Sequence, residues 1–510
     1  MVKHHNISRI KSGAIKLRKQ GSSGQSARPK NSYDGASKAD RLMDWSGFGG
    51  GPNAKNMDLI ELKKRSRDII FNTTEGTSAI DSFVSNAVGK GIMPLWNIKD
   101  REIRRQVQKL WKLSANQTDY RFKISFYGQQ QLAARHVFTD GEALGLFRPR
   151  PLNFRTPTGR LFVPLQLQLI ESDHLDHSIN HYLKVAQGSR VIDGLELNGH
   201  DDLTHFHISS RHPGDNDITA NQIRRIHRND VIHVYRMLRT GQRRGVPAMT
   251  AILIKLYEMN KYADAELLRK QFSAMITAFV EVPELDDDEL DNKEADFQKT
   301  VAGGIHFSAP GEKWQLSQPA DSGSPEWIIN MLHGIASAMN ITYEQLTGDL
   351  KGVSFSSIRA GLMEMRRRIL MIQRETIIFQ FCIPYVSKWM DFAVASGALN
   401  IPDYEEKRHE YLDIDWIPHH FEQVDPLKAS MNDVLEVQAG FKHRDQAAIE
   451  RGNNPEMIDE RNKESRERAE EHGNVYLTDL SKVNKQGDFQ DKVFDYLKSE
   501  QNQDENNNGN

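Results

Sequence analysis

The chain has 510 residues, of which 38% are hydrophobic, and its 67 lysines and arginines nearly balance its 69 aspartates and glutamates. This length can hold roughly two to four domains. The near-neutral charge excludes a surface that is basic throughout, so any contact with nucleic acid must come from local basic stripes. The single cysteine, Cys382, excludes an intrachain disulfide and a zinc site built from cysteines, and we expect it to be a small buried hydrophobe.

Residues 1–55 are rich in glycine, serine, lysine and arginine, a composition that predicts a flexible arm. The arm lacks the apolar core of about 7–15 residues that a signal peptide needs. No uninterrupted apolar run in the chain approaches the roughly 18 residues of a membrane span. We therefore expect an intracellular, soluble protein with no membrane partner.

Apolar residues at helical spacing predict four helices after the arm, over 57–71, 76–88, about 100–113 and 128–139. The pattern then changes to short alternating or apolar stretches between Gly, Pro, Asn and Asp turns, which is typical of half-buried strands. We therefore predict a β-rich module over residues 141–239.

A long helix is predicted over 248–279 and a second over 325–341, with Ser324 as its N-cap and Pro325 in its first turn. A polar, β-like insert separates them, so the two helices can run antiparallel and carry the insert at their tip. The insert is acidic, which suits either a solvated turn or an electrostatic docking face for a basic partner. Its acidic residues are Glu281, Glu284, Asp286, Asp287, Asp288, Glu289, Asp291, Glu294 and Asp296.

A loop with two glycines, residues 347–357, leads directly into a long helix over about 356–396. Lys351 is the only lysine of the loop. Apolar residues recur along the helix at steps of three and four, broken only by Thr376, which predicts one continuous apolar seam. Pro384 should kink the helix. The seam residues are Ile358, Leu362, Met365, Ile369, Ile372, Phe379 and Ile383.

Arginines follow two neighbouring lines on the same helix. Arg359 and Arg366 are seven residues apart, and so are Arg367 and Arg374. Spacing alone favours a solvated helix face with salt bridges to nearby glutamates over a contact surface for nucleic acid.

Sequence motifs for catalysis are not found. GFGGGPNAKN is rich in glycine, but asparagine follows its lysine and no apolar strand precedes it, so it is no phosphate loop. His205 and His207 share one strand face and could in principle hold a metal, although a solvent-facing pair is the plainer interpretation. Asp413 and Asp415 also share a strand face and could in principle hold a metal, but paired acids without a partner histidine or basic residue are common surface features. We expect no catalytic residue, no metal and no cofactor.

The C-terminal part begins near PDYEEKRHEYLDIDWIP and continues as a helix, a turn and a helix. The chain then ends in a polar tail, residues 476–510. We expect this tail to be mostly disordered.

Five stretches of the sequence, in order, resemble the portal proteins of tailed bacteriophages, specifically the lambda-type group. The most similar is ITYEQLTGDLKGVSFSSIRAGLMEMRR, which resembles that family's loop and long helix. The others are RSRDIIFNTTEGTSAIDSFVSNAVGKGIMP, DGEALGLF with PLQLQLIESDHLD, IHVYRMLRTGQRRGVPAMTAIL, and VLEVQAGFKHRDQAAIERGNNPEMI. Together they cover roughly residues 57–460.

The resemblance implies an α+β portal fold, with a wing that is helical and then β-rich, a two-helix stem carrying a small β-containing clip, a long kinked helix and a helical crown. Carried across by segment, the expected parts are the arm 1–55, the wing 57–240, the stem 248–279 and 325–341, the clip 280–324, the tunnel loop 347–357, the long helix 358–396, the crown 400–475 and the tail 476–510.

The resemblance also implies a function. The family forms a ring, usually of twelve subunits, at one capsid vertex, through which double-stranded DNA passes during packaging and ejection. Expected partners are further copies of the chain, DNA, the terminase large subunit, a head-completion or adaptor protein, and the major capsid and scaffolding proteins. The expected location is the portal vertex of the virion, and the host cytoplasm during assembly.

Two groups of residues follow as candidate sites. Lys351, Val353, Phe355, Arg359 and Arg366 would line the DNA channel. The clip residues Glu284, Asp286, Asp287 and Asp288 would dock a partner. The alternatives are a minor capsid or scaffold protein without a channel and a DNA-packaging enzyme, which would need the phosphate loop or carboxylate cluster that the sequence lacks.

Overall fold

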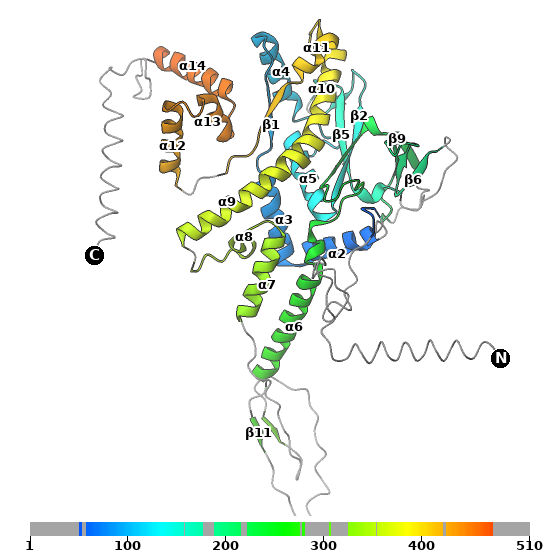
Figure 1. Cartoon of the computed structure of the whole chain (residues 1–510), viewed down its shortest axis with the longest axis vertical. Helices are drawn as coiled ribbons and strands as arrows, with labels where there is room; N and C mark the ends of the chain where they lie inside the picture. The colour runs from blue at the N-terminus through cyan, green and yellow to red at the C-terminus, as the bar shows by residue number, and fades with distance from the viewer. Residues whose placement is uncertain are drawn as a thin grey trace, which may run out of the picture. The chain divides into compact units, whose positions relative to one another are not determined.

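The computed structural model describes residues 50–53, 58–157, 159–176, 188–215, 222–275, 278–280, 305–307, 325–352, 354–421 and 425–472. The chain divides into two compact units, 1–54 and 55–510, and the description below concerns the second (Figure 1). The parts of the chain expected to form the arm, most of the clip and the tail lie almost wholly outside the described residues.

The four helices predicted after the arm are confirmed. They are α2 (Asp58–Asn72), α3 (Thr74–Ala87), α4 (Arg101–Ser114) and α5 (Phe126–Thr139). Side-chain caps set three of their starts, because Thr73, Asp100 and Ser125 each accept a hydrogen bond from a backbone N–H of the first turn. Between α3 and α4 lies the strand β1 (Met93–Trp96).

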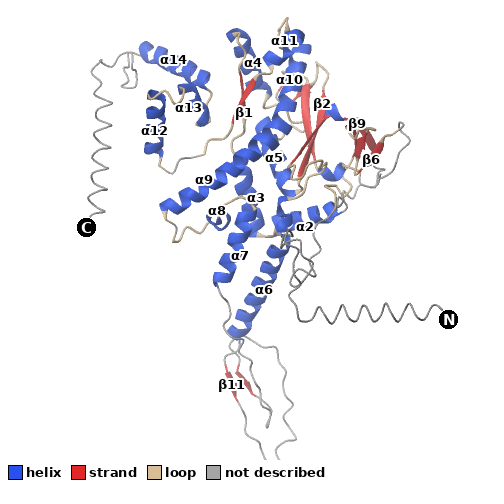
Figure 2. Ribbon diagram, viewed as in Figure 1, coloured by secondary structure: helices blue, strands red, loops and turns tan. Residues whose placement is uncertain are grey.

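The predicted β-rich module is also confirmed, as two antiparallel sheets (Figure 2). The first has β2 (Glu142–Pro149) between β10 (Val231–Tyr235) and β5 (Leu165–Ile170). The second has the order β6 (Arg190–Ile192), β7 (Leu195–Leu197), β8 (Leu203–Ser209) and β9 (Ile223–His227). A short hairpin joins β3 (Arg155–Thr156) to β4 (Gly159–Arg160).

The central strand β2 separates two cores. Ala143 and Phe147 belong to the large core that also contains the helices, whereas Leu144 and Leu146 belong to a smaller core beside the four-stranded sheet. This division follows from the strand period of two, which sends alternate side chains to opposite faces.

The helix pair of the predicted stem is shorter than the sequence indicated. The first helix, α6, spans Leu253–Met275. It begins later than predicted because Ala248–Ala251 form a 3-10 turn. After it, Ala278–Val280 form the strand β11, which pairs parallel with β12 (Ile305–Phe307). The second, α7 (Pro325–Ala338), begins at the expected proline and ends early because Asn340 takes a left-handed φ of 58°. The two helices run side by side in opposite directions (Figure 1), with the Tyr262 and Trp327 rings 5.0 Å apart.

The long helix is divided in three: α9 (Phe355–Ile372), a π-helical segment (Gln373–Cys382) and α10 (Ile383–Ala395). It bends between α9 and α10 (Figure 1), so the expected kink is present, in a broader form than a single proline would give. The N–H of Ile383 bonds to the carbonyl of Ile378, five residues back, and the next residue, Pro384, has no N–H to donate.

The π-helical segment makes the predicted continuous seam wrong in its second half. Ile369 and Ile372 are buried as expected, but Phe379 is 64% exposed and Ile383 is 39% exposed. The wider turns rotate the buried face, so Ile377 and Phe381 enter the core instead, each 0% exposed. The buried Ile369 and Ile372 pack inside the subunit itself.

Among the described residues, Ser356–Ala395 is a helical stretch long and apolar enough, by length and composition alone, to cross a membrane. Polar and charged residues such as Gln380 and Lys388 interrupt this stretch, so it is not one uninterrupted apolar run. Half of its most apolar window is buried inside the protein, where Tyr385 and Trp389 pack with Trp96, Trp111 and Phe126 in an aromatic core.

The C-terminal part contains more elements than the predicted helix, turn and helix. It begins with α11 (Tyr404–Tyr411) and β13 (Ile414–Ile417), and β13 pairs antiparallel with β1. The helices α12 (Pro426–Gln438), α13 (Arg444–Glu450) and α14 (Pro455–Glu471) follow.

Two phenylalanines test the rotation of the buried face. Phe381→Ala should destabilise the protein by about 3–5 kcal/mol, because it removes a fully buried ring. Phe379→Ala should change stability by less than about 0.5 kcal/mol, because its ring is largely exposed. Thermal or urea unfolding of the two purified variants measures both changes. A larger loss of stability for Phe379→Ala than for Phe381→Ala would mean that the buried face keeps regular α-helical spacing after all.

Candidate nucleic-acid interface and buried charge network

The predicted channel loop is shorter than 347–357. The short helix α8 (Tyr343–Thr347) ends where Gly348 adopts a left-handed φ of 70°, and Gly352 turns the chain again at 73°. Ser354 is the N-cap of α9, because its hydroxyl accepts the N–H of Ser357, so residues 355–357 are helical rather than loop. The connecting segment is therefore 348–354.

Lys351 is exposed on this connecting segment, and its backbone N–H donates to Asp349 Oδ1 at 3.0 Å. The segment thus carries one positive and one negative side chain. Phe355 is the first residue of α9. Val353 and the Phe355 side chain lie outside the described residues.

The two predicted lines of arginines on α9 differ in their surroundings. Arg367 and Arg368 pair with Glu364 at 3.7 and 3.4 Å on an exposed face, which is the solvated arrangement that spacing favoured. Arg366 is half-buried, and its guanidinium carbon lies 4.9 Å from the centre of the Phe421 ring. Burial lowers the pKa of Arg366.

Arg359 and Arg366 come together along a groove of about 570 Å³ that α9 shares with α12 and α13. Its lining includes Lys442, which pairs with Asp433 at 3.0 Å and also with Glu450. Lys351 is not among the lining residues. The structure therefore joins two of the five predicted channel residues at this groove and leaves Lys351 apart from them.

His207 of the histidine pair on β8 does not face solvent, contrary to expectation, and His205 is half-buried. His207 is buried, and its Nε2 lies 3.0 Å from Glu196 Oε2. Arg225 grips the same carboxylate through two hydrogen bonds of 2.7 and 2.8 Å. The Arg225 hydrogen bonds, helped by His207, hold the pKa of Glu196 at about 2 despite burial. A carboxylate bound by an arginine fork is a poor metal ligand, so this cluster is an ion-pair network.

The other acidic candidates are similarly engaged. Asp415 Oδ2 accepts a hydrogen bond from the Asn97 side chain at 3.1 Å. Glu171, Asp173 and His212 lie close enough together to hold a metal ion, a grouping that the sequence did not reveal. Arg67 forms ion pairs with both carboxylates of that group, so a cation is already present there.

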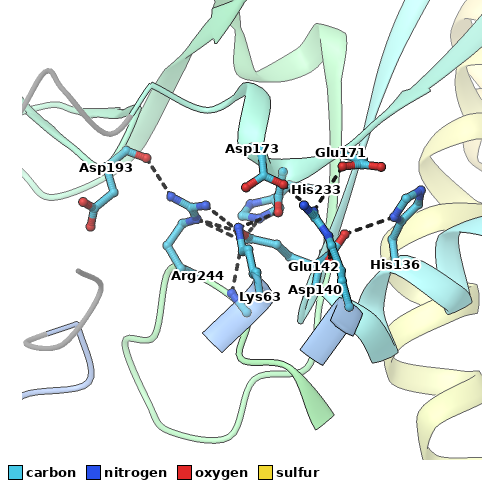
Figure 3. A network of polar contacts seen from close by, with 12 residues as sticks. Lys63, His136, Asp140, Glu142, Glu171, Asp173, Asp193, His233 and Arg244 are labelled. Carbon is cyan, nitrogen blue, oxygen red and sulfur yellow. Dashed lines mark hydrogen bonds and ion pairs between the residues drawn. The ribbon is translucent and has the colours of Figure 1, made fainter. Parts of the chain in front are cut away.

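A buried charge network surrounds Glu142, the first residue of β2 (Figure 3). Its carboxylate accepts hydrogen bonds from Lys63 Nζ at 3.1 Å, from Arg244 Nε at 2.9 Å and from the Gly245 N–H at 3.1 Å, and His233 Nε2 lies 3.0 Å away. Lys63, Glu142 and Arg244 are each at most 1% exposed. The network therefore joins α2, β2, β10 and the segment before α6.

Two glycines allow this approach. Gly141 has a φ of 88°, and a Cβ atom added there would lie 2.4 Å from the Val246 backbone. A Cβ atom on Gly245 would lie 1.9 Å from the Gly141 carbonyl oxygen. Only glycine at both positions lets the 244–246 segment pass close enough to bring Arg244 onto Glu142.

Electrostatics fix the charge state of this network. Burial by itself would raise the pKa of Glu142, but the positive charges of Arg244 and Lys63 outweigh it and hold that pKa well below its ordinary value. The carboxylate is therefore ionised wherever the protein is folded near neutral pH. Sequence reasoning missed the network, although Lys63 falls on the buried face of α2, one turn after Leu59.

Glu142→Gln should cost about 3–5 kcal/mol at neutral pH, because it leaves two buried cations without a counter-charge. Folding lowers the pKa of the Glu142 carboxyl, so its ionised form stabilises the folded protein. This stabilisation is complete above the pKa of an unfolded glutamate, about 4.3, and is lost as the pH falls through the pKa of the folded state. The unfolding free energy of the wild type should thus fall in acid, whereas that of the variant should change less.

Asp201→Asn is the matched control, because Asp201 also pairs with two arginines, Arg190 and Arg243, but at an exposed position. Its melting temperature should stay close to that of the wild type. Equal losses in the two variants, measured by thermal unfolding at a series of pH values, would contradict a special role for the buried carboxylate.

The four predicted docking residues, Glu284, Asp286, Asp287 and Asp288, lie outside the described residues.

Comparisons with known proteins agree on one family. A family model described as phage portal protein, lambda family, matches residues 38–373. The chain is 29% identical over 277 residues to a probable portal protein of Halomonas phage phiHAP-1, covering 52% of each chain. It is 23% identical over 484 residues to portal protein B of Escherichia phage lambda, covering 81% of this chain and 86% of that protein.

The aligned region thus spans about half the length of the Halomonas phage relative. Among solved structures, the chain is similar to the neck of a native gene transfer agent particle, with 12% identity and a TM-score of 0.44, covering 78% of this chain and 94% of that one.

Proposed function

The chain belongs to the lambda family of phage portal proteins, and from this membership we infer that it assembles into a ring at one capsid vertex, through which double-stranded DNA enters and leaves the head. The observation that carries the proposal is the family match over residues 38–373, which includes the first helices, the β-rich module, the helix pair and α9. We propose a ring of about twelve subunits that acts as a structural conduit rather than as an enzyme.

We propose that the 348–354 segment faces the channel and that Lys351, Val353 and Phe355 touch passing DNA. Two left-handed glycines support this assignment, because they give the segment backbone freedom. Arg359 and Arg366 on the following helix would add positive potential behind the loop.

A conduit for DNA needs weak contacts. Each phosphate that a lysine or arginine neutralises releases counterions and increases the affinity for DNA. A dense row of unpaired cations would therefore hold DNA in place instead of letting it slide. The segment offers one lysine and one aspartate, Asp349. Two of the four arginines on α9, Arg367 and Arg368, are already paired with Glu364. In a ring, such weak contacts still add up through avidity.

The loop proposal is tested by packaging. Lys351→Glu, or deletion of residues 350–354, should permit ring and procapsid assembly but impair packaging or retention of the genome, because the mobile phosphate contact is lost. Packaged DNA length per particle, measured beside capsid yield, checks this. Normal DNA length with the loop deleted would remove the assignment, and loss of capsids would make the loop structural.

We further propose that the acidic insert docks a basic surface of the packaging machinery, such as the terminase large subunit or a head-completion protein. We also propose that the outer surface of the ring contacts the capsid and scaffolding proteins in the virion. Neutralising Glu284, Asp286, Asp287 and Asp288 should leave ring assembly intact and weaken motor docking, most strongly at low salt. Pull-down of the motor protein at several salt concentrations measures this, and unchanged docking would make the insert a solvated turn.

A further inference from the structure

A second basic surface lies on the β-rich module, where β2 ends. Arg148 is near the end of β2, and Arg150 follows it by two residues and continues the ladder through its N–H bond to the Pro164 carbonyl at 2.9 Å. Residues two apart on a strand point to the same face about 7 Å apart. The two guanidinium groups therefore stand side by side.

Both guanidinium groups are held by glutamines of the neighbouring strand β5. Arg150 Nε donates to Gln166 Oε1 at 2.8 Å, and Arg148 Nε donates to Gln168 Oε1 at 2.9 Å. Gln166 is fully buried, and its amide nitrogen donates to the carbonyls of Gln117 and Asp119 at 3.0 and 2.8 Å. These bonds fix the orientation of the Gln166 amide, so its oxygen is directed at Arg150.

Aromatic rings support the same two arginines. The guanidinium carbon of Arg150 lies 4.4 Å from the centres of both the Tyr120 and Phe154 rings, and that of Arg148 lies 5.8 Å from Tyr120. Phe122 stacks on Phe154 with 6.3 Å between ring centres. Each Arg thus has its Nε bonded to a glutamine and its guanidinium group against at least one ring, while its outer N–H groups can donate to the oxygens of an anion.

The surroundings add positive charge and no compensating acid. Exposed arginines lie close by in sequence or in space: Arg121, Arg155, Arg160 and Arg224. Within the described residues, no ion pair engages these four or Arg148 and Arg150. The nearby Asp119 is buried, and its carboxylate accepts the Lys123 N–H and the Gln129 amide. Burial lowers the pKa of Arg148, and the charges of Arg224 and Arg150 lower it further.

We propose that this surface, Arg148 and Arg150 with their arginine neighbours, is a binding site for the phosphate backbone of duplex DNA, separate from the 348–354 loop. The oxygens of successive phosphates can each accept from one guanidinium fork, and a row of arginines suits the repeated charge of a nucleic-acid backbone. Arg150 lies against the Tyr120 and Phe154 rings and Phe122 stacks on Phe154, so these half-buried rings are partly occupied and favour a duplex over the stacked bases of a single strand. Binding is therefore independent of sequence, and it requires neither the ring nor the loop.

The test is a double variant of the full chain, Arg148→Gln with Arg150→Gln, titrated against a fluorescent duplex of about 20 base pairs. Its affinity in low salt should fall at least tenfold, and the slope of log K against log salt should become shallower by about two, one unit for each lost phosphate contact. The variant Arg148→Lys with Arg150→Lys should recover only part of the affinity, because lysine keeps the charge but not the fork.

The matched control removes two exposed arginines that are paired with carboxylates, through Arg105→Gln and Arg444→Gln. It carries the same change in net charge and should bind within about twofold of the wild type.

An unchanged affinity and salt slope in the Gln double variant, with a melting temperature like that of the wild type, would overturn the proposal. If the Gln variant fails to fold, the Lys variant decides, because full wild-type affinity there would equally rule out recognition by the guanidinium forks. Displacement of the duplex by polyglutamate as readily as by unlabelled DNA would mean an acidic protein partner instead.

Discussion

The carboxylate of Glu142 is the point at which four separate segments of the chain meet. Lys63 and Arg244 are buried as completely as Glu142 is, and neither would be tolerated there without its negative charge. The helix α2, the strand β10 and the segment that leads into α6 are therefore positioned by one electrostatic requirement. Everything that follows in the chain, including the helix pair, starts from a segment anchored at this carboxylate.

The same strand connects this network to the surface. Glu142 opens β2, Leu144 and Leu146 fill the smaller core, and Arg148 lies near the other end on the same face. Ala143 and Phe147, on the opposite face, pack instead into the large core. One strand thus supports a buried ion network, two hydrophobic cores and an arginine-rich surface, because its two faces alternate strictly.

Much of the fold was predictable from local signals. Apolar residues at helical spacing placed the early helices within a few residues, and turn residues between short apolar stretches placed the β-rich module. The failures have a shared cause, which is that local patterns assume regular geometry. The apolar seam along the long helix was predicted with regular α-helical spacing. Because residues 373–382 are π-helical, Phe379 lies at the surface and Phe381 lies in the core.

The polar sites failed for a different reason. Glu142 and Arg244 are 102 residues apart, and Glu196 and Arg225 are 29 apart, so their pairing depends on tertiary contacts that no local pattern contains. His207 was expected to face solvent because nothing in THFHIS indicates that Glu196 and Arg225 cover it. The candidate channel loop was located by resemblance, and its true start and end depend on capping at Gly348 and Ser354.

The pairing of β1 with β13 has a consequence for synthesis of the chain on the ribosome. Trp96 pairs with Ile414, and Met93 pairs with Ile417, so this two-stranded sheet closes across more than 300 residues. At about 5–20 residues per second, the first strand waits for roughly 15–60 s before its partner is made. During that interval the edge of β1 is unpaired and Trp96 lacks part of its final environment, so the nascent chain exposes a strand edge on which it can aggregate.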